Sequence, residues 1–444
     1  MKSQITILDF GAVGDGVTDN TKVFSETIEQ ASKKRSGKVI VPAGTYLTGP
    51  IRLRSNINLH LEKDAVIVFE DNFENWPAIK SRWEGVECFG YLPCVYGENL
   101  KDVSITGEGT IDGRGQAWWK EFKRRKAAGQ KQPESDRDKE FARLNENIDL
   151  SDCGGGGISS FFFRPPLIQF NNCTNILLEG FTTRNSPFWN THILYCKKVL
   201  VKNVTFQNPS DGINGDGLDI DSCDGVEVLD CTFDVNDDCL VIKSGIGKDG
   251  IRVNRPCQNV VVKNCKMMRG HGCVVMGSET AGGIRNIEIS DCVFNGNDRG
   301  LRIKSRRGRA GTVENITLSN ITMKGVGCPV VMHLYYEYGA RPEEIAAISD
   351  RNPRPVTDTT PCIQNIKVRN VTAENSQVAA AFMLGLPERP IENILFENVK
   401  VTMDKNGKAA RPAFAFGVKE MKGQGIITEF VKDFIQRNVS VKWQ

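Results

Sequence analysis

The chain lacks a long apolar run, a strong excess of one charge and the paired cysteines of a zinc site. No stretch of its 444 residues reaches the roughly 18 apolar residues of a membrane-spanning helix, so we expect no membrane association. The formal net charge is only +3, which is too even for a general nucleic-acid binder. The cysteine and histidine spacings match no zinc motif, and we expect neither a metal nor a cofactor.

The N-terminus also lacks a recognisable export signal. Residues 1–10 read as the start of a strand, without the basic and apolar regions of a signal peptide. The expected location of the chain as given is therefore cytoplasmic, and a trimmed N-terminus would make it periplasmic or secreted. With 40% hydrophobic and 25% charged residues, the chain can bury a large core. Nothing in the sequence indicates an oligomeric state.

A short pattern of alternating apolar residues followed by Asn or Asp recurs along the chain. It begins near Ile176 and returns at Val199, Val226, Val260, Ile287, Ile316, Ile366 and Ile394. Each unit contains short β-branched segments separated by Gly, Asn and Asp, which predicts strands and turns. The pattern favours an all-β fold, a right-handed parallel β-helix, in which each coil rests on its neighbours about 4.8 Å away. Residues 1–444 would then form a single solenoid domain.

The 14 cysteines fit the interior of such a solenoid. Cys231, Cys265 and Cys292 share one repeat position, which Val204 and Ile321 fill in other coils. A position that accepts Cys or an aliphatic residue is a packing column, because a free cysteine behaves as a small buried hydrophobe. We therefore expect buried free thiols.

Segments outside the repeat are expected to cover its ends and edges. A helix from about Thr21 to Lys34, capped by Asp19 or Asn20, would cover the first coil. Residues 114–165 and 335–361 interrupt the repeat, and we expect these two insertions at a cleft. The first begins with a basic, aromatic helix around residues 118–126 and ends in the flexible run Gly154 to Gly157.

Four short polar blocks occupy equivalent places in successive repeats. They are Asn214-Gly215-Asp216, Asp237-Asp238-Cys239, Gly270-His271-Gly272 and Arg302-Ile303-Lys304. Counting from the cysteine column puts Asp216 over Asp238 and Asp237 over His271, about one coil spacing apart. Such crowding of carboxylates raises at least one pKa. Each residue alone could be structural, but their joint register across four coils indicates a catalytic site.

Three clustered carboxylates suit the hydrolysis of a glycosidic bond. One carboxylic acid must protonate the leaving oxygen while a carboxylate activates water. Asp216 and Asp238, stacked as a pair, could hold that water, and Asp237 beside His271 would be the general acid. Arg302 and Lys304 would bind a substrate carboxylate, so the expected partner is an acidic polysaccharide or oligogalacturonide. Arg299 belongs to a dense cationic run, completed by Arg306, Arg307 and Arg309, that suggests further uronate subsites.

At these residues the chain resembles the polygalacturonases of glycoside hydrolase family 28. The four blocks stand in the order found in that family, and residues 186–192, which include His192, resemble its preceding segment. The resemblance implies metal-free hydrolysis of α-1,4-galacturonosidic bonds with inversion. It implies that the acid is the first Asp of the pair, that the other two Asp residues activate water, and that Asn214 and His192 are candidate substrate contacts.

Two features refine the resemblance. Gly215 stands where the family has Thr, which would loosen the turn that holds Asp216. The family's substrate-binding Tyr corresponds to Tyr335 or Tyr336, between which spacing does not choose. The first insertion and residues 164–168 are similar to the exo-acting bacterial branch, whose insertions close one end of the cleft, so we expect release of galacturonic acid from a chain end.

Other activities remain open at this point. Relatives within the family cleave rhamnogalacturonan or xylogalacturonan, so fragments of rhamnogalacturonan are an alternative substrate. A β-helical pectate lyase would need a calcium site and an arginine base. A non-catalytic polysaccharide-binding β-helix would keep the cations but would have no need of three clustered Asp residues.

Overall fold

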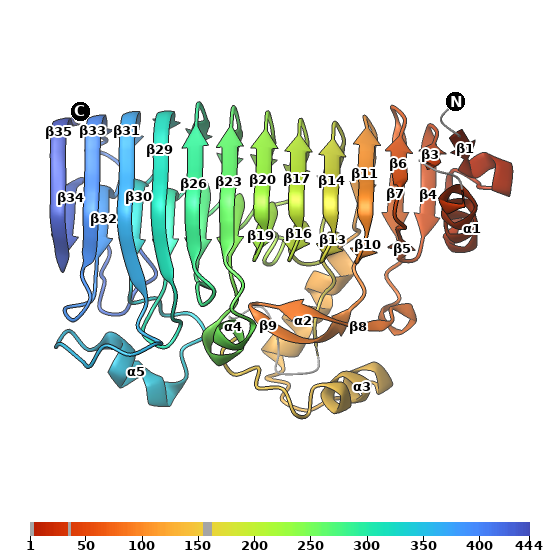
Figure 1. Ribbon diagram of the computed structural model, residues 1–444, viewed down its shortest axis with the longest axis horizontal. Helices are drawn as coiled ribbons and strands as arrows, with labels where there is room; N and C mark the ends of the chain where they lie inside the picture. The colour runs from red at the N-terminus through yellow and green to blue at the C-terminus, as the bar shows by residue number, and fades with distance from the viewer. Residues whose placement is uncertain (1–3, 34–36, 154–161) are drawn as a thin grey trace.

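The chain forms an elongated stack of β-coils with its two termini at opposite ends (Figure 1). The computed structural model describes residues 4–33, 37–153 and 162–444. Strands of successive coils pair in parallel and line up in three columns. The predicted right-handed parallel β-helix is therefore confirmed.

Two of the columns merge into one sheet of 22 strands. The first column consists of β1 (Gln4–Thr6), β3 (Gly37–Val41), β6 (Ile57–Leu61), β11 (Lys101–Gly107), β14 (Thr174–Glu179), β17 (Lys197–Lys202), β20 (Asp224–Leu229), β23 (Cys257–Lys263), β26 (Ile284–Ser290), β29 (Thr312–Lys324), β31 (Cys362–Ser376), β33 (Ile391–Met403) and β35 (Val431–Trp443). The second consists of β2 (Asp15–Asp19), β4 (Gly44–Thr48), β7 (Ala65–Phe69), β12 (Thr110–Asp112), β15 (Thr182–Arg184), β18 (Thr205–Gln207), β21 (Thr232–Asp234), β24 (Lys266–Arg269) and β27 (Val293–Asn295). Both columns join at β29, which pairs with β26 and β27.

The third column is a separate sheet of 11 strands and carries the polar blocks. It consists of β5 (Ile51–Arg52), β10 (Val95–Glu98), β13 (Ile168–Asn171), β16 (Thr191–Leu194), β19 (Leu218–Asp221), β22 (Leu240–Lys243), β25 (Val274–Gly277), β28 (Arg299–Lys304), β30 (Cys328–His333), β32 (Ala379–Leu384) and β34 (Gln424–Glu429). Side chains of these strands that point away from the interior form the floor of the site described below.

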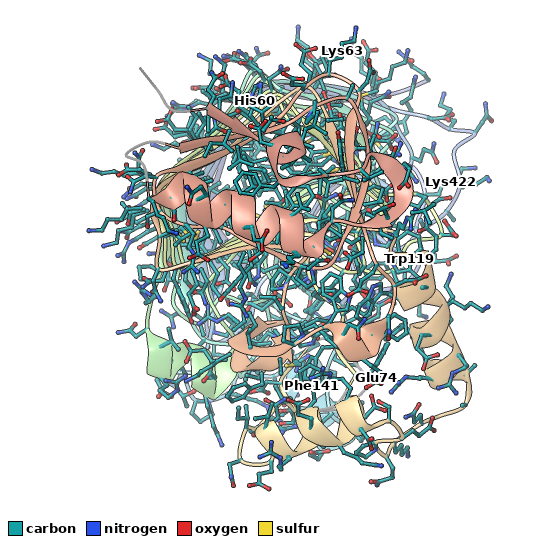
Figure 2. All side chains as sticks on the ribbon, turned by 90° about the vertical axis from the view of Figure 1, so that its right-hand side faces the viewer. His60, Lys63, Glu74, Trp119, Phe141 and Lys422 are labelled. Carbon is teal, nitrogen blue, oxygen red and sulfur yellow. The ribbon has the colours of Figure 1, made fainter. Side chains whose placement is uncertain are left out.

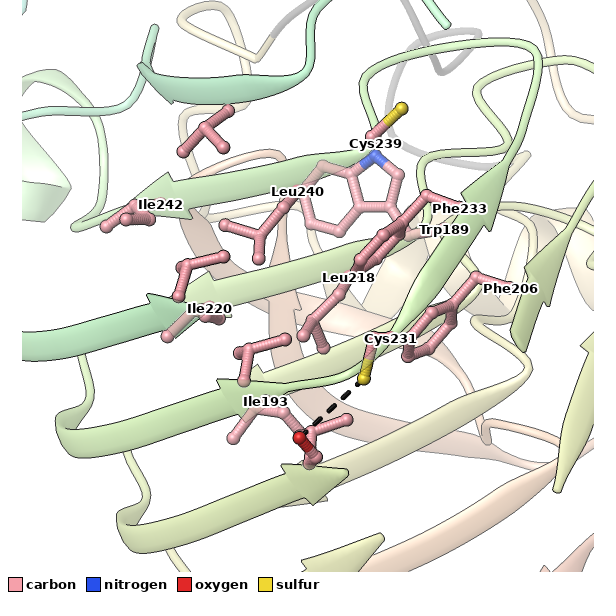
Figure 3. Packing of buried hydrophobic residues seen from close by; sticks show 14 of the residues in the cluster. Trp189, Ile193, Phe206, Leu218, Ile220, Cys231, Phe233, Cys239, Leu240 and Ile242 are labelled. Atoms are coloured by element: carbon pink, nitrogen blue, oxygen red, sulfur yellow. Dashed lines mark hydrogen bonds between the residues drawn. The ribbon is translucent and has the colours of Figure 1, made fainter. Parts of the chain in front are cut away.

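Alternating residues in each strand fill the interior of the coil. Ile193, Ile220 and Ile242 come from paired positions of β16, β19 and β22, and Phe206 stacks on Phe233 with ring centroids 4.7 Å apart (Figure 3). The recurrent Asn residues near the start of the first-column strands have positive φ, a conformation that Asn tolerates better than most residues. Their side chains hydrogen-bond from coil to coil, which explains why the repeat keeps Asn at this strand position.

The cysteines lie where the repeat count places them. Thirteen are buried and Cys153 is partly buried, and all 14 are free thiols. Cys265 lies between Cys231 and Cys292 in adjoining coils, and its backbone N–H donates to the Cys292 Sγ over 3.4 Å. The predicted packing column of free thiols is therefore confirmed.

Helix α1 (Thr21–Ser32) lies across the N-terminal end of the stack, as expected (Figure 2). Its buried residues, including Phe24 and Ile28, belong to the main core. Asp19 accepts the Thr21 N–H at 2.9 Å, while Asn20 turns its side chain to the Val13 backbone. The helix ends two residues before the predicted Lys34, which lies outside the described residues.

Apart from α1, the α-helices and an antiparallel β-hairpin lie along one side of the stack (Figure 1). The first insertion folds into α2 (Gln116–Ala127) and α3 (Asp136–Leu144), and the second contains α5 (Pro342–Ser349). The predicted flexible run of Gly154 to Gly157 lies outside the described residues. The sequence did not predict the antiparallel hairpin of β8 (Ala78–Trp83) and β9 (Val86–Tyr91), nor α4 (Gly247–Val253).

The described residues also contain two short 3-10 helices, η1 (Ile7–Phe10) and η2 (Phe73–Asn75). Among the described residues, no helix combines the length and the apolar character that a membrane crossing requires.

The cysteine column predicts which core substitutions are tolerated. Cys265→Val should change the free energy of unfolding by less than about 1.5 kcal/mol, because other coils of the stack carry Val204 or Ile321 at this position. Phe233→Ala should lose about 3–5 kcal/mol, because it leaves a cavity beside Phe206. Urea titration of the two variants measures both values. A larger loss for Cys265→Val than for Phe233→Ala would contradict the assignment of this column to simple packing.

Candidate active site

The polar blocks converge at one edge of the third column of strands. Asp216 lies two residues before β19 and Asp238 two residues before β22, while Arg302 and Lys304 are in β28. Leu218 pairs with Leu240, and Val274 pairs with Leu301, which is the register expected from the sequence. The His271 N–H donates to the Asp237 carbonyl at 2.9 Å, which joins the histidine and Asp237 blocks of adjacent coils.

The three aspartates form one carboxylate cluster. One oxygen from each of Asp216, Asp237 and Asp238 lies within 4.8 Å of the others. Asp216 and Asp238 are buried, whereas the side chain of Asp237 is 25% exposed. The His271 Nδ1 lies 3.8 Å from the Asp237 Oδ1 and is even more exposed. Asp237 is thus the carboxyl group that a bound molecule can reach most directly.

Asp238 is held in its ionised form by two cations. Arg302 Nη1 lies 2.9 Å from its Oδ1, and Lys304 Nζ lies 2.7 Å from its Oδ2. Burial alone would raise the pKa of Asp238, but the charges of Lys304 and Arg302 outweigh it and hold the pKa below its usual value. The two cations therefore have an intramolecular partner beside the site, in addition to any substrate they bind.

Asp216 has the opposite electrostatic environment. Burial raises its pKa well above the ordinary value, and the nearby Asp237 and Asp219 charges raise it further. Asp219, at the floor behind it, is also fully buried, and burial raises its pKa as well. The expectation that crowding raises at least one pKa in the cluster is confirmed at Asp216.

The cluster opens into a cavity of about 290 Å³. Segments outside the coil repeat supply much of its wall. These are the β8–β9 turn, α2, the segment after β30 and the loop before β34, which contribute Glu84, Phe122, Lys126, Tyr336, Tyr338 and Phe414. The wall residues come from sequence positions up to about 330 residues apart, so only the folded chain brings them together.

The other candidate substrate contacts fall into two groups. Asn214 and Tyr336 line the cavity, and the Asn214 Oδ1 accepts a hydrogen bond from Arg164 at 2.7 Å. Tyr335, His192 and Arg299 lie outside the cavity lining. Tyr335 is fully buried in the main core.

His192 and Arg299 have partners within the protein. His192 is fully buried, with its Nδ1 2.7 Å from the Gln169 amide and its Nε2 3.5 Å from Asp221. Arg299 donates to the carbonyls of Arg411 and Pro412 at 2.9 Å and lies over the Phe414 ring. It thereby fixes the loop that carries Phe414.

The rest of the predicted cationic run also holds loops in place, which differs from the subsites suggested by the sequence. Arg306 donates to the Tyr338 and Gly339 carbonyls at 2.7 and 2.8 Å. Arg307 forms an ion pair with Glu388 at 2.7 Å, and Arg309 donates to the Tyr338 carbonyl at 3.1 Å. Backbone carbonyls and a carboxylate therefore already occupy these guanidinium groups.

The turn before Asp216 is closely packed, contrary to the expectation that Gly215 loosens it. A Cβ at this position would lie 2.3 Å from the Asn236 Oδ1 and 2.6 Å from the Asn208 Nδ2. The same Asn208 amide donates to the Gly215 carbonyl at 2.9 Å. The absence of a side chain at Gly215 makes room for the two asparagines that support the turn.

Sequence reasoning missed a buried ion pair in the cavity. Lys243 Nζ lies 3.1 Å from Glu279 and 3.6 Å from Asp219, and it stands 4.3 Å from the centre of the Trp189 ring. Glu279 directly follows the serine of the aligned Ser278 column, so extending the repeat frame by one residue could have found it. Glu84 and Phe414 gave no such signal, because they belong to segments without a repeat.

The opposite environments of Asp216 and Asp238 predict opposite effects on stability. Asp216 has a raised pKa in the folded protein, so its contribution to stability is lost as pH rises above the unfolded pKa of about 3.9. Asp216→Asn should therefore stabilise the protein by about 0.5–2 kcal/mol at pH 8, and by less at pH 5. Denaturant unfolding at both pH values measures this difference.

Asp238→Asn is the matched control. Asp238 has a lowered folded pKa, so it stabilises the protein above the unfolded pKa, and removing its charge leaves Arg302 and Lys304 buried without their partner. A loss of about 3–5 kcal/mol is expected. A stabilised Asp238→Asn variant, or an Asp216→Asn variant with no gain at pH 8, would contradict this electrostatic assignment.

Comparison with known proteins relates this geometry to a family. The family model described as "Glycosyl hydrolases family 28" matches residues 162–413. A second model, described as "Rhamnogalacturonase A/epimerase, pectate lyase-like", matches residues 4–80. The first match contains all four polar blocks and covers more than half of the chain.

Individual relatives agree with this match. A probable polygalacturonase from Vitis vinifera is 32% identical over 413 residues, covering 91% of this chain and 75% of the relative. An exo-poly-alpha-D-galacturonosidase from Dickeya chrysanthemi is 26% identical, covering 84% of this chain and 63% of the relative. This chain thus spans less than two thirds of the Dickeya protein.

A solved structure with a similar fold covers the whole chain. The crystal structure of a hyperthermoactive exopolygalacturonase from Thermotoga maritima aligns with a TM-score of 0.79 and 30% identity, covering 100% of this chain and 92% of that one. The likeness extends from the capping helix to the last coil. Together with the carboxylate cluster and the matched family model, it shows that the chain belongs to glycosyl hydrolases family 28, whose characteristic reaction is inverting hydrolysis of glycosidic bonds.

Proposed function

We propose that this chain hydrolyses α-1,4-galacturonosidic bonds from the end of a pectin chain and releases galacturonic acid. The observation that carries the exo-acting part is the small cavity around the carboxylate cluster, walled by α2, the β8–β9 turn and the Phe414 loop. An enzyme that cuts within a polymer needs a groove open at both ends. The walls that α2, the β8–β9 turn and the Phe414 loop add beside the carboxylate cluster instead favour binding of a chain end.

The arrangement supports distinct roles for the three aspartates. Asp238, held ionised by Arg302 and Lys304, suits the base that takes a proton from water. Asp216, in the next coil, would hold the same water from the other side. Asp237 is the most exposed of the three and lies beside His271, so it suits the acid that protonates the leaving oxygen.

The raised pKa of Asp216 bears on where the catalytic proton resides. Burial raises the pKa of Asp216, and the nearby Asp237 and Asp219 charges raise it further, whereas Lys304 and Arg302 lower the pKa of Asp238, so Asp216 holds a proton more readily than Asp238 does. A proton held by Asp216 could then pass to Asp237, the proposed acid, within the cluster. The short separation of the three groups supports such a transfer when substrate binds.

Inversion follows from family membership and not from the carboxylate spacing. Most inverting glycosidases keep their two carboxyl groups about 6.5–9.5 Å apart to leave room for water. Here the nearest oxygens lie within 4.8 Å. The attacking water must therefore sit against the Asp216 and Asp238 pair, with Asp237 at the rim of the same cluster.

The first test is the product profile on polygalacturonate. Saturated galacturonic acid should appear from the earliest times without a mixture of longer products, and absorbance at about 235 nm should stay flat. The newly formed monomer should have the inverted anomeric configuration by proton NMR. Unsaturated, absorbing products would mean a lyase, and a ladder of oligomers would mean cleavage within the chain. If sugar is released only from rhamnogalacturonan fragments, those fragments are the substrate instead of polygalacturonate.

The second test separates the acid from the base. Asp237→Asn should lose about 10²–10⁴-fold in kcat on digalacturonate, and much less on 4-nitrophenyl galacturonide, whose leaving group needs little protonation. Asp238→Asn should lose activity on both substrates, because both need activated water. If Asp216→Asn, and not Asp237→Asn, keeps most of its activity on 4-nitrophenyl galacturonide, the acid is Asp216.

A further inference from the structure

The cations of the cavity differ in whether they already have a carboxylate partner. Arg302 and Lys304 contact Asp238, and Lys243 contacts Glu279 and Asp219. Lys126 also lines the cavity, but no salt bridge joins it to a carboxylate within the described residues. A polyanionic substrate that enters this acidic site therefore meets one lysine whose charge is not yet neutralised.

The helix that carries Lys126 is basic, but its cations are not equivalent. Arg124 and Arg125 form ion pairs with Glu121, and Lys123 donates to the Asp211 carbonyl at 3.1 Å. Lys120 and Lys126 remain, and both are exposed. Of this pair, Lys126 alone lines the cavity, so α2 (Gln116–Ala127) adds one cation without a salt-bridge partner to the wall of the cavity that contains the carboxylate cluster.

The helix is anchored firmly enough to hold this lysine in position. Arg125 forms a buried ion pair with Asp138 of α3 at 2.7 Å, and the buried Trp119 donates its indole N–H to the Ser186 carbonyl at 3.1 Å. Phe122, one turn before Lys126, packs with Ile213 of the loop that leads to Asp216. The Lys126 Nζ lies 5.9 Å from the centre of the Phe122 ring, so its stem runs along this apolar surface.

We propose that Lys126 binds a carboxylate of the bound oligogalacturonide and makes the enzyme prefer an unesterified sugar at that place. This inference rests on the proposed function and adds a specificity-determining residue from the insertion to those of the coil columns. A lysine in the last turn also stabilises the helix dipole by about 0.3–1 kcal/mol. That structural contribution is the same whatever the substrate, so substrate dependence separates the two roles.

The experiment compares Lys126→Gln with Lys120→Gln, which removes an equal charge from the same helix outside the cavity. Affinities for digalacturonate, and for the two digalacturonates that carry one methyl ester, are measured by calorimetry in an Asp237→Asn background without turnover. Lys126→Gln should weaken binding of the unesterified sugar about tenfold, equivalent to about 1.4 kcal/mol. For one ester isomer the loss should disappear, and that isomer identifies the sugar that Lys126 contacts.

Two further measurements complete the test. Lys126→Arg should keep most of the affinity, and high salt should reduce the difference between wild type and Lys126→Gln, because the contact is a partly exposed charge pair. Equal affinities of Lys126→Gln and Lys120→Gln for digalacturonate would overturn the proposal. An equal loss of affinity for the unesterified digalacturonate and for both methyl esters would overturn it as well. If wild type neither binds nor cleaves oligogalacturonides, the proposed function fails instead.

Discussion

The parallel pairing of successive coils is the constraint on which the rest of the molecule depends. Its hydrogen bonds fix residues of adjacent coils about 4.8 Å apart, so equal positions in the repeat become neighbours in space. Inside the coil this produces stacked isoleucines, phenylalanines and thiols. On the outer face of β19, β22, β25 and β28 it brings carboxylates and cations into contact. The core and the active site thus lie on the inner and outer faces of the same paired strands.

The same constraint explains how far the sequence could predict the structure. The repeat frame places Asp216 over Asp238 and puts Arg302 in the column of Asp219 and Val241, and the pairing of β19 with β22 and of β25 with β28 agrees. Within that frame even Glu279 was within reach, because it follows the aligned Ser278. Prediction succeeds here because each contact joins equivalent positions of adjacent repeats, which the pattern identifies even though the repeats differ in length.

Contacts outside the frame could not be predicted in the same way. Arg299 reaches the carbonyls of Arg411 and Pro412, and Arg164 reaches Asn214, over sequence separations that no period sets. In the sequence alone, the run of arginines after β28 looks like a surface that binds substrate. In the fold, buried carbonyl groups satisfy most of it, since a loop that covers a cleft needs donors for its backbone.

Charge balance links the repeat to the insertions. Stacking three carboxylates is unfavourable, and Arg302 and Lys304 offset it by neutralising Asp238. The better they do so, the less charge they offer to an anionic substrate. The third column of strands has little room for further cationic side chains, because each would have to fit the buried floor of the site beside Lys243. An insertion helix can add Lys126 to the cavity wall without altering the register of the coils, so the solenoid can keep the chemistry fixed while the insertions adjust which sugars bind.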